Sequence, residues 1–286
     1  MRSATAKNGR DSRPQCIKAN FVTSNAKTPL TYRVLAIHAH PDDIEFQCAG
    51  TLALLAERGH EITIATMTPG DCGSRELSPD EIAAVRREEG RAAAAKIGAP
   101  YHCLEFRDLS IVIDNDSKRR VTELVRRVRP QIVFAPPPVD YMDDHEATSR
   151  LVRDACFNAS CPNYATRQWD PAPAAEQIPY LYYVDPLGGV DPWGTPVVPH
   201  FYVDVSAKFE IKRQMLACHA SQREWLRAQH GVDEYLESQR RWSESRGAEV
   251  SVPHAEAFRQ HRGHPYPHDN ILGSLLREVR LPDGNV

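Results

Sequence analysis

The sequence has 286 residues and a formal net charge of −3, with 41% hydrophobic and 26% charged residues. These values are typical of a globular protein that buries a large core. The charge excludes a general attraction to nucleic acid, and no apolar run approaches the roughly 20 residues that span a bilayer. We therefore expect a soluble protein with no nucleic-acid partner and no membrane span.

The N-terminal segment differs in composition from the rest of the chain. Residues 1–31 are polar and lack the apolar segment of a secretory signal, so we interpret them as a tail, with a transit peptide as the alternative. Residues 32–286 are expected to form one domain, with a core at 32–160 and a C-terminal extension at 161–286 packed on it. The seven cysteines include no CxxC pair, which favours reduced thiols and a cytoplasmic location.

The first predicted element is a buried strand at residues 34–37, which ends at a cluster of ionisable side chains. His40, Asp42 and Asp43 follow, and helical spacing begins at Ile44. The cluster therefore lies in a strand-to-helix turn, where open α/β sheets bind ligands. His40 and Asp43 are ordinary zinc ligands, and Asp42 between them is placed to act as a base. The alternative is helix capping by either aspartate, with His40 only packed at the strand end.

Strands and helices alternate through the next hundred residues. Strands are predicted at 61–67, 101–106 and 131–135, and helices at 78–98 and 121–128. This alternation, without a tight hairpin signal, predicts right-handed βαβ units. The expected fold class is α/β, a Rossmann-like, doubly wound, mostly parallel sheet with helices on both faces. The loops that follow its strands then meet at one edge of the sheet.

Two of these loops carry further candidate site residues. Arg75 follows the second strand, and its guanidinium suits sugar hydroxyls or an anionic group; a solvated loop arginine is the alternative. His145 begins the helix after the fourth strand and is a candidate metal ligand, with a solvated first-turn residue as the alternative. Asp140 and Tyr141 are candidates for substrate contact or for orienting the ligands.

Beyond residue 160 the pattern loosens into an irregular extension with Pro-rich spacers. Strands are predicted at 179–184 and 201–205, and a long helix at 208–230. His219 lies on or beside the apolar face of that helix, where a buried core histidine competes with a role in the site. His264 is one of three histidines in a polar segment that resembles a surface loop.

The segment Ala39-His40-Pro41-Asp42-Asp43 resembles the AHPDD signature of the PIG-L/LmbE-like de-N-acetylases, and the similarity extends over most of residues 33–270. The resemblance implies a zinc enzyme that removes an N-acetyl group from glucosamine-type sugars. It implies that Asp42 is the base and that Arg75 contacts substrate. The implied zinc ligands are His40, Asp43 and His145.

One position departs from the family pattern. Met142 stands where the family usually has a second His that serves as proton donor, so His219 and His264 become candidates for that catalytic role. The departure keeps open a second hypothesis, a non-catalytic metal- or carbohydrate-binding member of the same fold. A nucleotide-binding Rossmann domain is disfavoured because no GxGxxG follows the first strand. The expected partner is a small N-acetylated amino sugar, and the sequence leaves a homo-oligomer open.

Overall fold

The structure is a computed structural model that describes residues 30–223 and 234–282. The chain divides into two compact units, residues 1–30 and 31–286, and all described helices and strands belong to the second. Among the described residues, none of the helices has both the length and the apolar character that crossing a bilayer requires.

The second unit is built on an eight-stranded sheet of order β3-β2-β1-β4-β5-β7-β6-β8. Its parallel part runs from β3 to β5 and consists of short apolar strands. Their bounds are β1 (Arg33–His38), β2 (Glu61–Thr66), β3 (Tyr101–Cys103), β4 (Ile132–Ala135) and β5 (Tyr180–Val184). Continuous apolar runs in parallel strands require cover on both faces of the sheet.

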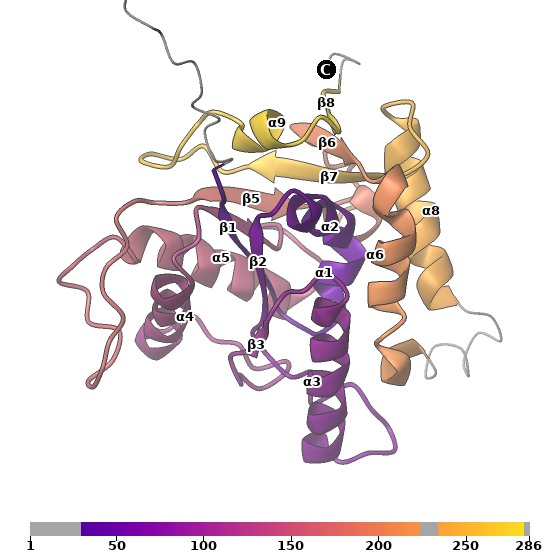
Figure 1. Cartoon of the computed structure of the whole chain (residues 1–286). Coiled ribbons are helices and arrows are strands. Elements are labelled where there is room, and N and C mark those ends of the chain that lie inside the picture. Colours follow the sequence, from indigo (N-terminus) through magenta and orange to yellow (C-terminus); the bar gives the residue numbers. More distant parts are fainter. Residues whose placement is uncertain (1–29, 224–233, 283–286) are drawn as a thin grey trace, which may run out of the picture. The chain divides into compact units, whose positions relative to one another are not determined.

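Helices cover both faces, as the strand alternation predicts (Figure 1). Val34 and Ala36 of β1 point into one hydrophobic cluster, and Leu35 and Ile37 point into the other. The first cluster contains α1 (Asp43–Gln47), α2 (Ala49–Glu57), α3 (Pro79–Ala95) and α6 (Phe209–Leu216). The second contains α4 (Asn115–Val128) and α5 (Asp143–Asn158). The predicted α/β fold class is therefore confirmed.

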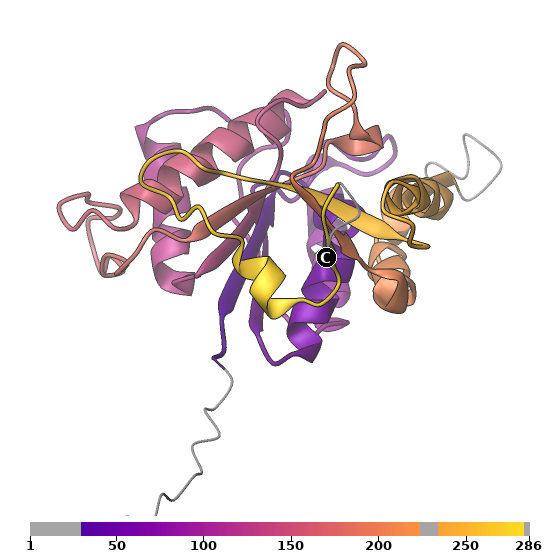
Figure 2. The ribbon, with the colours of Figure 1, turned by 90° about the horizontal axis from the view of Figure 1, so that it is seen from above.

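The C-terminal region completes the sheet with antiparallel strands and is more regular than its sequence pattern indicates. These strands are β6 (Phe201–Asp204), β7 (Ala255–Gln260) and β8 (Val279–Arg280). The region also contains α8 (Glu234–Ala248), α9 (Ile271–Leu275) and two short 3-10 turns, Leu187–Gly189 and Ser206–Lys208. Figure 2 shows α6 and α8 side by side at one end of the sheet.

Two predicted helices differ from those in the structure. The predicted helix at 208–230 is interrupted, because α6 ends at Leu216 and helical structure resumes only at Ala220; residues 224–230 lie outside the described part of the chain. The helix after the first strand is broken at Cys48, which has φ −142° and ψ 9°. The break exposes the first amides of α2, and the Glu256 carboxylate of β7 accepts hydrogen bonds from two of them.

Candidate metal centre and active site

The site lies at the edge of the sheet where the parallel strands end. β1 delivers the turn from Ala39 to Asp42 into α1, and β4 leads through a loop into α5, which begins one residue before Asp144. The loop after β3 adds Asp108, and the loop after β2 adds Arg75. The convergence of these loops follows from the parallel topology, as predicted.

The three predicted metal ligands lie around one carboxylate oxygen, but among the described residues the donor atoms that lie within 4.8 Å of one another form two groups. These groups are His38 with Asp43 and His145, and His40 with Asp108 and Asp144. Asp43 Oδ2 lies 3.4 Å from His40 Nδ1 and 3.4 Å from His145 Nε2. His40 and His145 are buried, so the solvated alternative for His145 is wrong. Burial alone would raise the pKa of Asp43, but His38 and His145 outweigh it and hold that pKa well below its usual range. Asp43 is therefore an anion in this cluster.

The outer nitrogen of each predicted ligand histidine faces a carboxylate. His40 Nε2 lies 2.8 Å from Asp108 Oδ1 and 3.3 Å from Asp144 Oδ2. His145 Nδ1 lies 3.0 Å from Asp140 Oδ1. Carboxylates in this position fix the tautomer and orientation of histidines that bind a metal. The structure therefore places Asp140 as an orienting residue, and its buried side chain corrects the expectation that it contacts substrate.

The donor atoms that remain suit a divalent cation. His145 Nε2 is buried without a hydrogen-bond partner among the described residues. A buried polar nitrogen without a hydrogen bond or another ligand lowers the stability of the folded protein. Two imidazoles and one carboxylate form the donor set of a catalytic zinc site with an open position. The residues of this cluster therefore fit zinc.

His38, the last residue of β1, belongs to the same cluster and was missed by the sequence analysis. Its Nδ1 lies 2.6 Å from Asp43 Oδ2 and accepts a hydrogen bond from the Ala39 amide. Its Nε2 is buried without a partner in the described chain, and no carboxylate orients it there. The sequence signal that could have found His38 was a second imidazole two residues before His40, at the end of the predicted strand.

Asp42 has an unusual backbone and is held by two side chains. Its φ of 106° lies in the left-handed region, a strain that concentrates at functional sites. Its carboxylate caps none of the described α1 amides, so the capping alternative is wrong for this residue. Asp42 Oδ2 accepts a hydrogen bond from the Tyr235 hydroxyl at 2.6 Å and lies 3.4 Å from Arg86 Nη2. Burial raises the pKa of Asp42, and Arg86 offsets this only in part.

Arg86 is buried beneath the turn and was also missed. Its guanidinium donates hydrogen bonds to the Pro41 carbonyl at 2.6 Å and to the Gly70 carbonyl at 3.3 Å. A Cβ at Gly70 would collide with the Arg86 guanidinium, and Gly70 has φ +72°, so only glycine fits there. The sequence feature that could have identified Arg86 is its position four residues after Ile82, which places a charged residue on the apolar face of the predicted helix.

A cavity of about 380 Å³ opens onto the cluster. Most residues that line it are polar, and they include the exposed Arg75 and the half-buried Ser74 and Gln222. Tyr141 also lines it, and its ring meets the His145 ring edge to face at 5.5 Å. Arg75 and Tyr141 thus both line this cavity, and their contact with a substrate stays a prediction.

The two histidines suggested as proton donors, His219 and His264, are not among the described residues that line the cavities around Asp42. The charge of His219 nevertheless acts on the Asp42 carboxyl and, against the effect of burial, lowers its pKa. His219 is 0% exposed, with Nε2 3.4 Å from Glu45 Oε1. His264 follows β7, which runs antiparallel to β5 and carries the chain to the opposite edge of the sheet. Neither is retained as a group that touches substrate.

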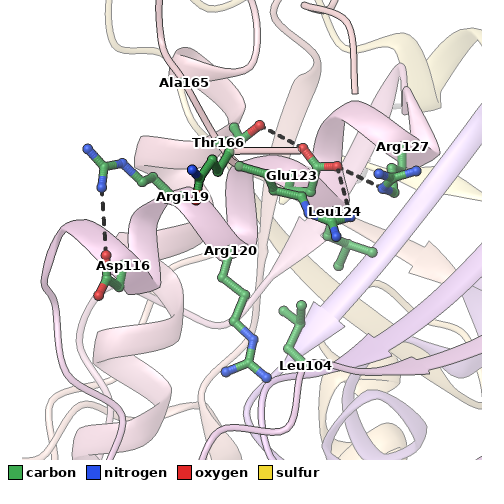
Figure 3. A pocket seen from close by; sticks show the side chains of 11 residues that line it. Leu104, Asp116, Arg119, Arg120, Glu123, Leu124, Arg127, Ala165 and Thr166 are labelled. Atoms are coloured by element: carbon green, nitrogen blue, oxygen red, sulfur yellow. Dashed lines mark hydrogen bonds and ion pairs between the residues drawn. The ribbon is translucent and has the colours of Figure 1, made fainter. Parts of the chain in front are cut away.

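A larger cavity, of about 680 Å³, lies over α4 and has a different character. Figure 3 shows arginine side chains around it, with Arg119 paired to Asp116 and Arg127 paired to Glu123. Glu123 also accepts a hydrogen bond from the Thr166 hydroxyl. This groove contains none of the histidines of the metal-binding cluster, and we assign the chemistry to the cluster at the strand ends.

The sheet is doubly wound, and two histidines and an aspartate lie at its strand ends beside a second aspartate. This combination defines a class of proteins, the PIG-L/LmbE-like fold. The family model described as PIG-L, GlcNAc-PI de-N-acetylase, matches residues 35–156. The uncharacterized deacetylase YaiS of Escherichia coli is 30% identical over 133 residues, 43% of this chain and 67% of YaiS. This chain belongs to the PIG-L/LmbE-like de-N-acetylase family.

Other relatives differ in their reactions. The chain is 27% identical to the diacetylchitobiose deacetylase of Thermococcus kodakarensis, over 66% of this chain and 70% of the relative. It is 26% identical to the 4-oxalmesaconate hydratase of Pseudomonas putida, over 69% and 76% of the two chains. The structure of N,N'-diacetylchitobiose deacetylase from Pyrococcus horikoshii, with its inhibitor MPG, superimposes with a TM-score of 0.68 at 25% identity and covers 83% of this chain and 88% of that one.

Proposed function

We propose that this protein is a zinc-dependent amidohydrolase that removes the N-acetyl group from an N-acetylglucosamine-type sugar or conjugate. The observation that carries the proposal is the pairing of Asp42, which ligates nothing in the proposed set, with the His40, Asp43 and His145 cluster in one cavity. A protein that only bound a metal or a sugar would not need a half-buried, strained base beside the ligands. Relatives named as deacetylases support the same reaction.

His40 Nδ1, Asp43 Oδ2 and His145 Nε2 would hold the ion. Asp108 and Asp144 keep the His40 ring oriented. The Asp144 carboxylate is itself held in place, because it accepts hydrogen bonds from the backbone amides of Leu109 at 2.7 Å and Ile111 at 3.3 Å. Zinc bound there supplies Lewis-acid chemistry, since it polarises a carbonyl and acidifies water.

Asp42 is the proposed general base. Tyr235 and Arg86 both engage Oδ2, so Oδ1 is left to face the reacting centre. Asp42 takes a proton from the attacking water while the water oxygen bonds to the amide carbon. The raised pKa of Asp42 suits this role, because a base works best when its pKa approaches the working pH.

The departing amine must then receive a proton when the carbon–nitrogen bond breaks. Met142 lines the cavity but has no proton to give. We assign this step to Asp42, which returns the proton that it took from water. The first water proton ends on the amine nitrogen and the second stays on the carboxyl group, so the products are acetic acid and the free amine, and the atoms and charges balance without a second acid.

The test is acetate release from N-acetylglucosamine derivatives by the purified full chain. We expect release that chelator abolishes and that zinc restores, with metal content rising in parallel. Chelator-insensitive release would contradict the metal dependence. Binding without release from any derivative would favour the non-catalytic alternative.

A second candidate function is hydration of an unsaturated organic acid. The similarity to a hydratase favours it, and so does the guanidinium group of Arg75 in the polar cavity, where it could meet a substrate carboxylate. Loss of the ultraviolet absorbance of a conjugated dicarboxylate, without acetate release from any sugar, would select this function.

A further inference from the structure

The cavity of about 680 Å³ over α4, here called the α4 groove, has the size of a small-molecule site. Three segments line it, namely Leu104 in the loop after β3, one face of α4, and residues 165–168. None of the described residues that line it also lines the polar cavity at the strand ends. A ligand in the α4 groove would therefore lie outside the proposed active site.

The α4 groove combines apolar side chains with an excess of positive charge. Leu104 and Leu124 line it and pack against the hydrophobic cluster beneath α4. Its lining also contains four arginines and two carboxylates, and hence an excess of two positive charges (Figure 3). The arginines are Arg119, Arg120, Arg127 and Arg167, and the carboxylates are Asp116 and Glu123.

The buried carboxylate of the groove is already engaged by two of these arginines. Glu123 Oε1 lies 2.8 Å from Arg127 Nε and 3.9 Å from Arg167 Nη1. The other oxygen of Glu123 accepts a hydrogen bond from the Thr166 hydroxyl at 2.6 Å. Glu123 therefore offsets charge on Arg127 and Arg167, and the positive charge of the other two arginines remains.

Those two arginines, Arg119 and Arg120, are adjacent in the N-terminal half of α4. Arg119 lies 3.7 Å from Asp116 in an exposed ion pair, which contributes little. The Arg120 guanidinium lies 4.7 Å above the Phe106 ring and forms neither an ion pair nor a hydrogen bond with another described side chain. A guanidinium binds a phosphate group through two parallel hydrogen bonds, so this pair suits a phosphate.

We propose that the α4 groove binds a phosphate ester of a flat ring compound, as a ligand distinct from the substrate. The phosphate lies at Arg119 and Arg120, and the ring lies against Leu104 and Leu124, where it is removed from water. A phosphate monoester carries about two negative charges at pH 7, which matches the excess charge of the lining. The inference is independent of the proposed function, because the groove contains none of the proposed zinc ligands.

The experiment is calorimetric titration of the zinc-loaded full chain with adenosine 5′-monophosphate, adenosine and inorganic phosphate. We expect the nucleotide to bind about tenfold or more tightly than either of the other two, since each of them can make only part of the contacts. Arg120→Gln should bring the affinity for the nucleotide close to that for adenosine. Arg91→Gln, at an exposed arginine of α3 that pairs with Glu88, is the matched control and should leave the affinity unchanged.

A second titration separates the α4 groove from the metal centre, where zinc could itself bind a phosphate. Binding of the nucleotide in the groove should persist in chelator-treated protein, whether or not the wild type releases acetate. Binding that disappears with the metal, or that is equally tight in Arg120→Gln and in the wild type, would overturn the inference. A nucleotide that binds no more tightly than inorganic phosphate would overturn it as well, because the ring would then contribute nothing.

Discussion

Asp42 and Asp43 are consecutive residues with opposite electrostatic environments. The pKa of Asp43 is held well below its usual range by histidines, whereas the pKa of Asp42 is raised by burial. When the environment moves the pKa values of two neighbouring carboxylates apart, the two groups can have different roles. One stays an anion, and the other takes up and releases a proton. The left-handed backbone of Asp42 makes this division possible, because it turns two adjacent side chains toward different partners.

Replacing the base should remove activity without removing the fold. Asn tolerates the left-handed backbone of position 42, so Asp42→Asn should fold normally. We expect acetate release to fall by about a hundredfold or more, as for loss of a general base. Asp143→Asn, at an exposed position in the first turn of α5, is the matched control and should retain activity. A variant at position 42 with near-normal turnover would remove Asp42 from the mechanism.

Tyr235 has a positioning role that can be separated from binding. Tyr235→Phe keeps the ring but removes the hydroxyl that bonds to Asp42 at 2.6 Å. We expect kcat to fall about tenfold, the equivalent of one good hydrogen bond to a charged group, with little change in KM. Tyr180→Phe removes a hydroxyl that bonds to Asp269 and serves as control. A change in KM alone would show that Tyr235 only contacts substrate.

At the scale of elements, α2 begins where a distant strand supplies its cap. Glu256 of β7 accepts hydrogen bonds from the amides of Gly50 at 2.8 Å and Thr51 at 2.7 Å. The same carboxylate forms an ion pair with Lys212 of α6 at 2.6 Å, and both side chains are 1% exposed. An anion at a helix N-terminus is favourable, and here it also compensates a buried cation. One residue thus joins two helices to the antiparallel part of the sheet.

Removing that charge should destabilise the protein strongly. Glu256→Gln leaves Lys212 buried and unpaired, and we expect the free energy of unfolding to fall by about 3 kcal/mol or more. Urea unfolding followed by circular dichroism measures the change. Glu57→Gln removes the partner of Lys208 in an exposed ion pair and should have little effect. Similar midpoints for the two variants would contradict the structural importance of the buried pair.

At the scale of the whole molecule, the sequence predicted the parallel half of the fold better than the antiparallel half. Strands such as residues 132–135 are continuous apolar runs between helical patterns, which have a clear local signal. β7 contains Glu256 and Arg259, and charged residues interrupt the apolar pattern by which a buried strand is predicted. Only the structure shows that Glu256 pairs with Lys212. The cluster was predictable from its AHPDD turn, but Tyr235 was not, since nothing local links it to Asp42.

The metal-free protein should lose stability as the pH rises. Burial disfavours a charged His145, but Asp43 and Asp140 outweigh it and raise its pKa to about 9, compared with about 6.5 in an unfolded chain. The folded state therefore binds this proton more tightly. Its contribution, on the order of 3 kcal/mol, is fully present below the unfolded pKa and is lost as the pH rises through the folded pKa.

Melting temperatures of chelator-treated protein at about pH 6 and about pH 10 measure this effect. We expect the lower value at the higher pH, and a smaller difference in His145→Gln. Adding zinc should weaken the dependence, because the ion competes with the proton for the same nitrogen. Greater stability of the metal-free protein at the higher pH would contradict the assignment.

The cap that Glu256 provides for α2 also sets an order of events during synthesis. All three proposed zinc ligands have been translated once α5 is complete at Asn158, but Tyr235 and Glu256 are encoded 77 and 98 codons later (235 − 158 and 256 − 158). A nascent chain arrested after α5 would thus contain the proposed ligands but would lack Glu256, which caps α2, and Tyr235, which hydrogen-bonds to Asp42. We expect such a chain to be catalytically silent, so that the enzyme switches on only when translation is nearly finished.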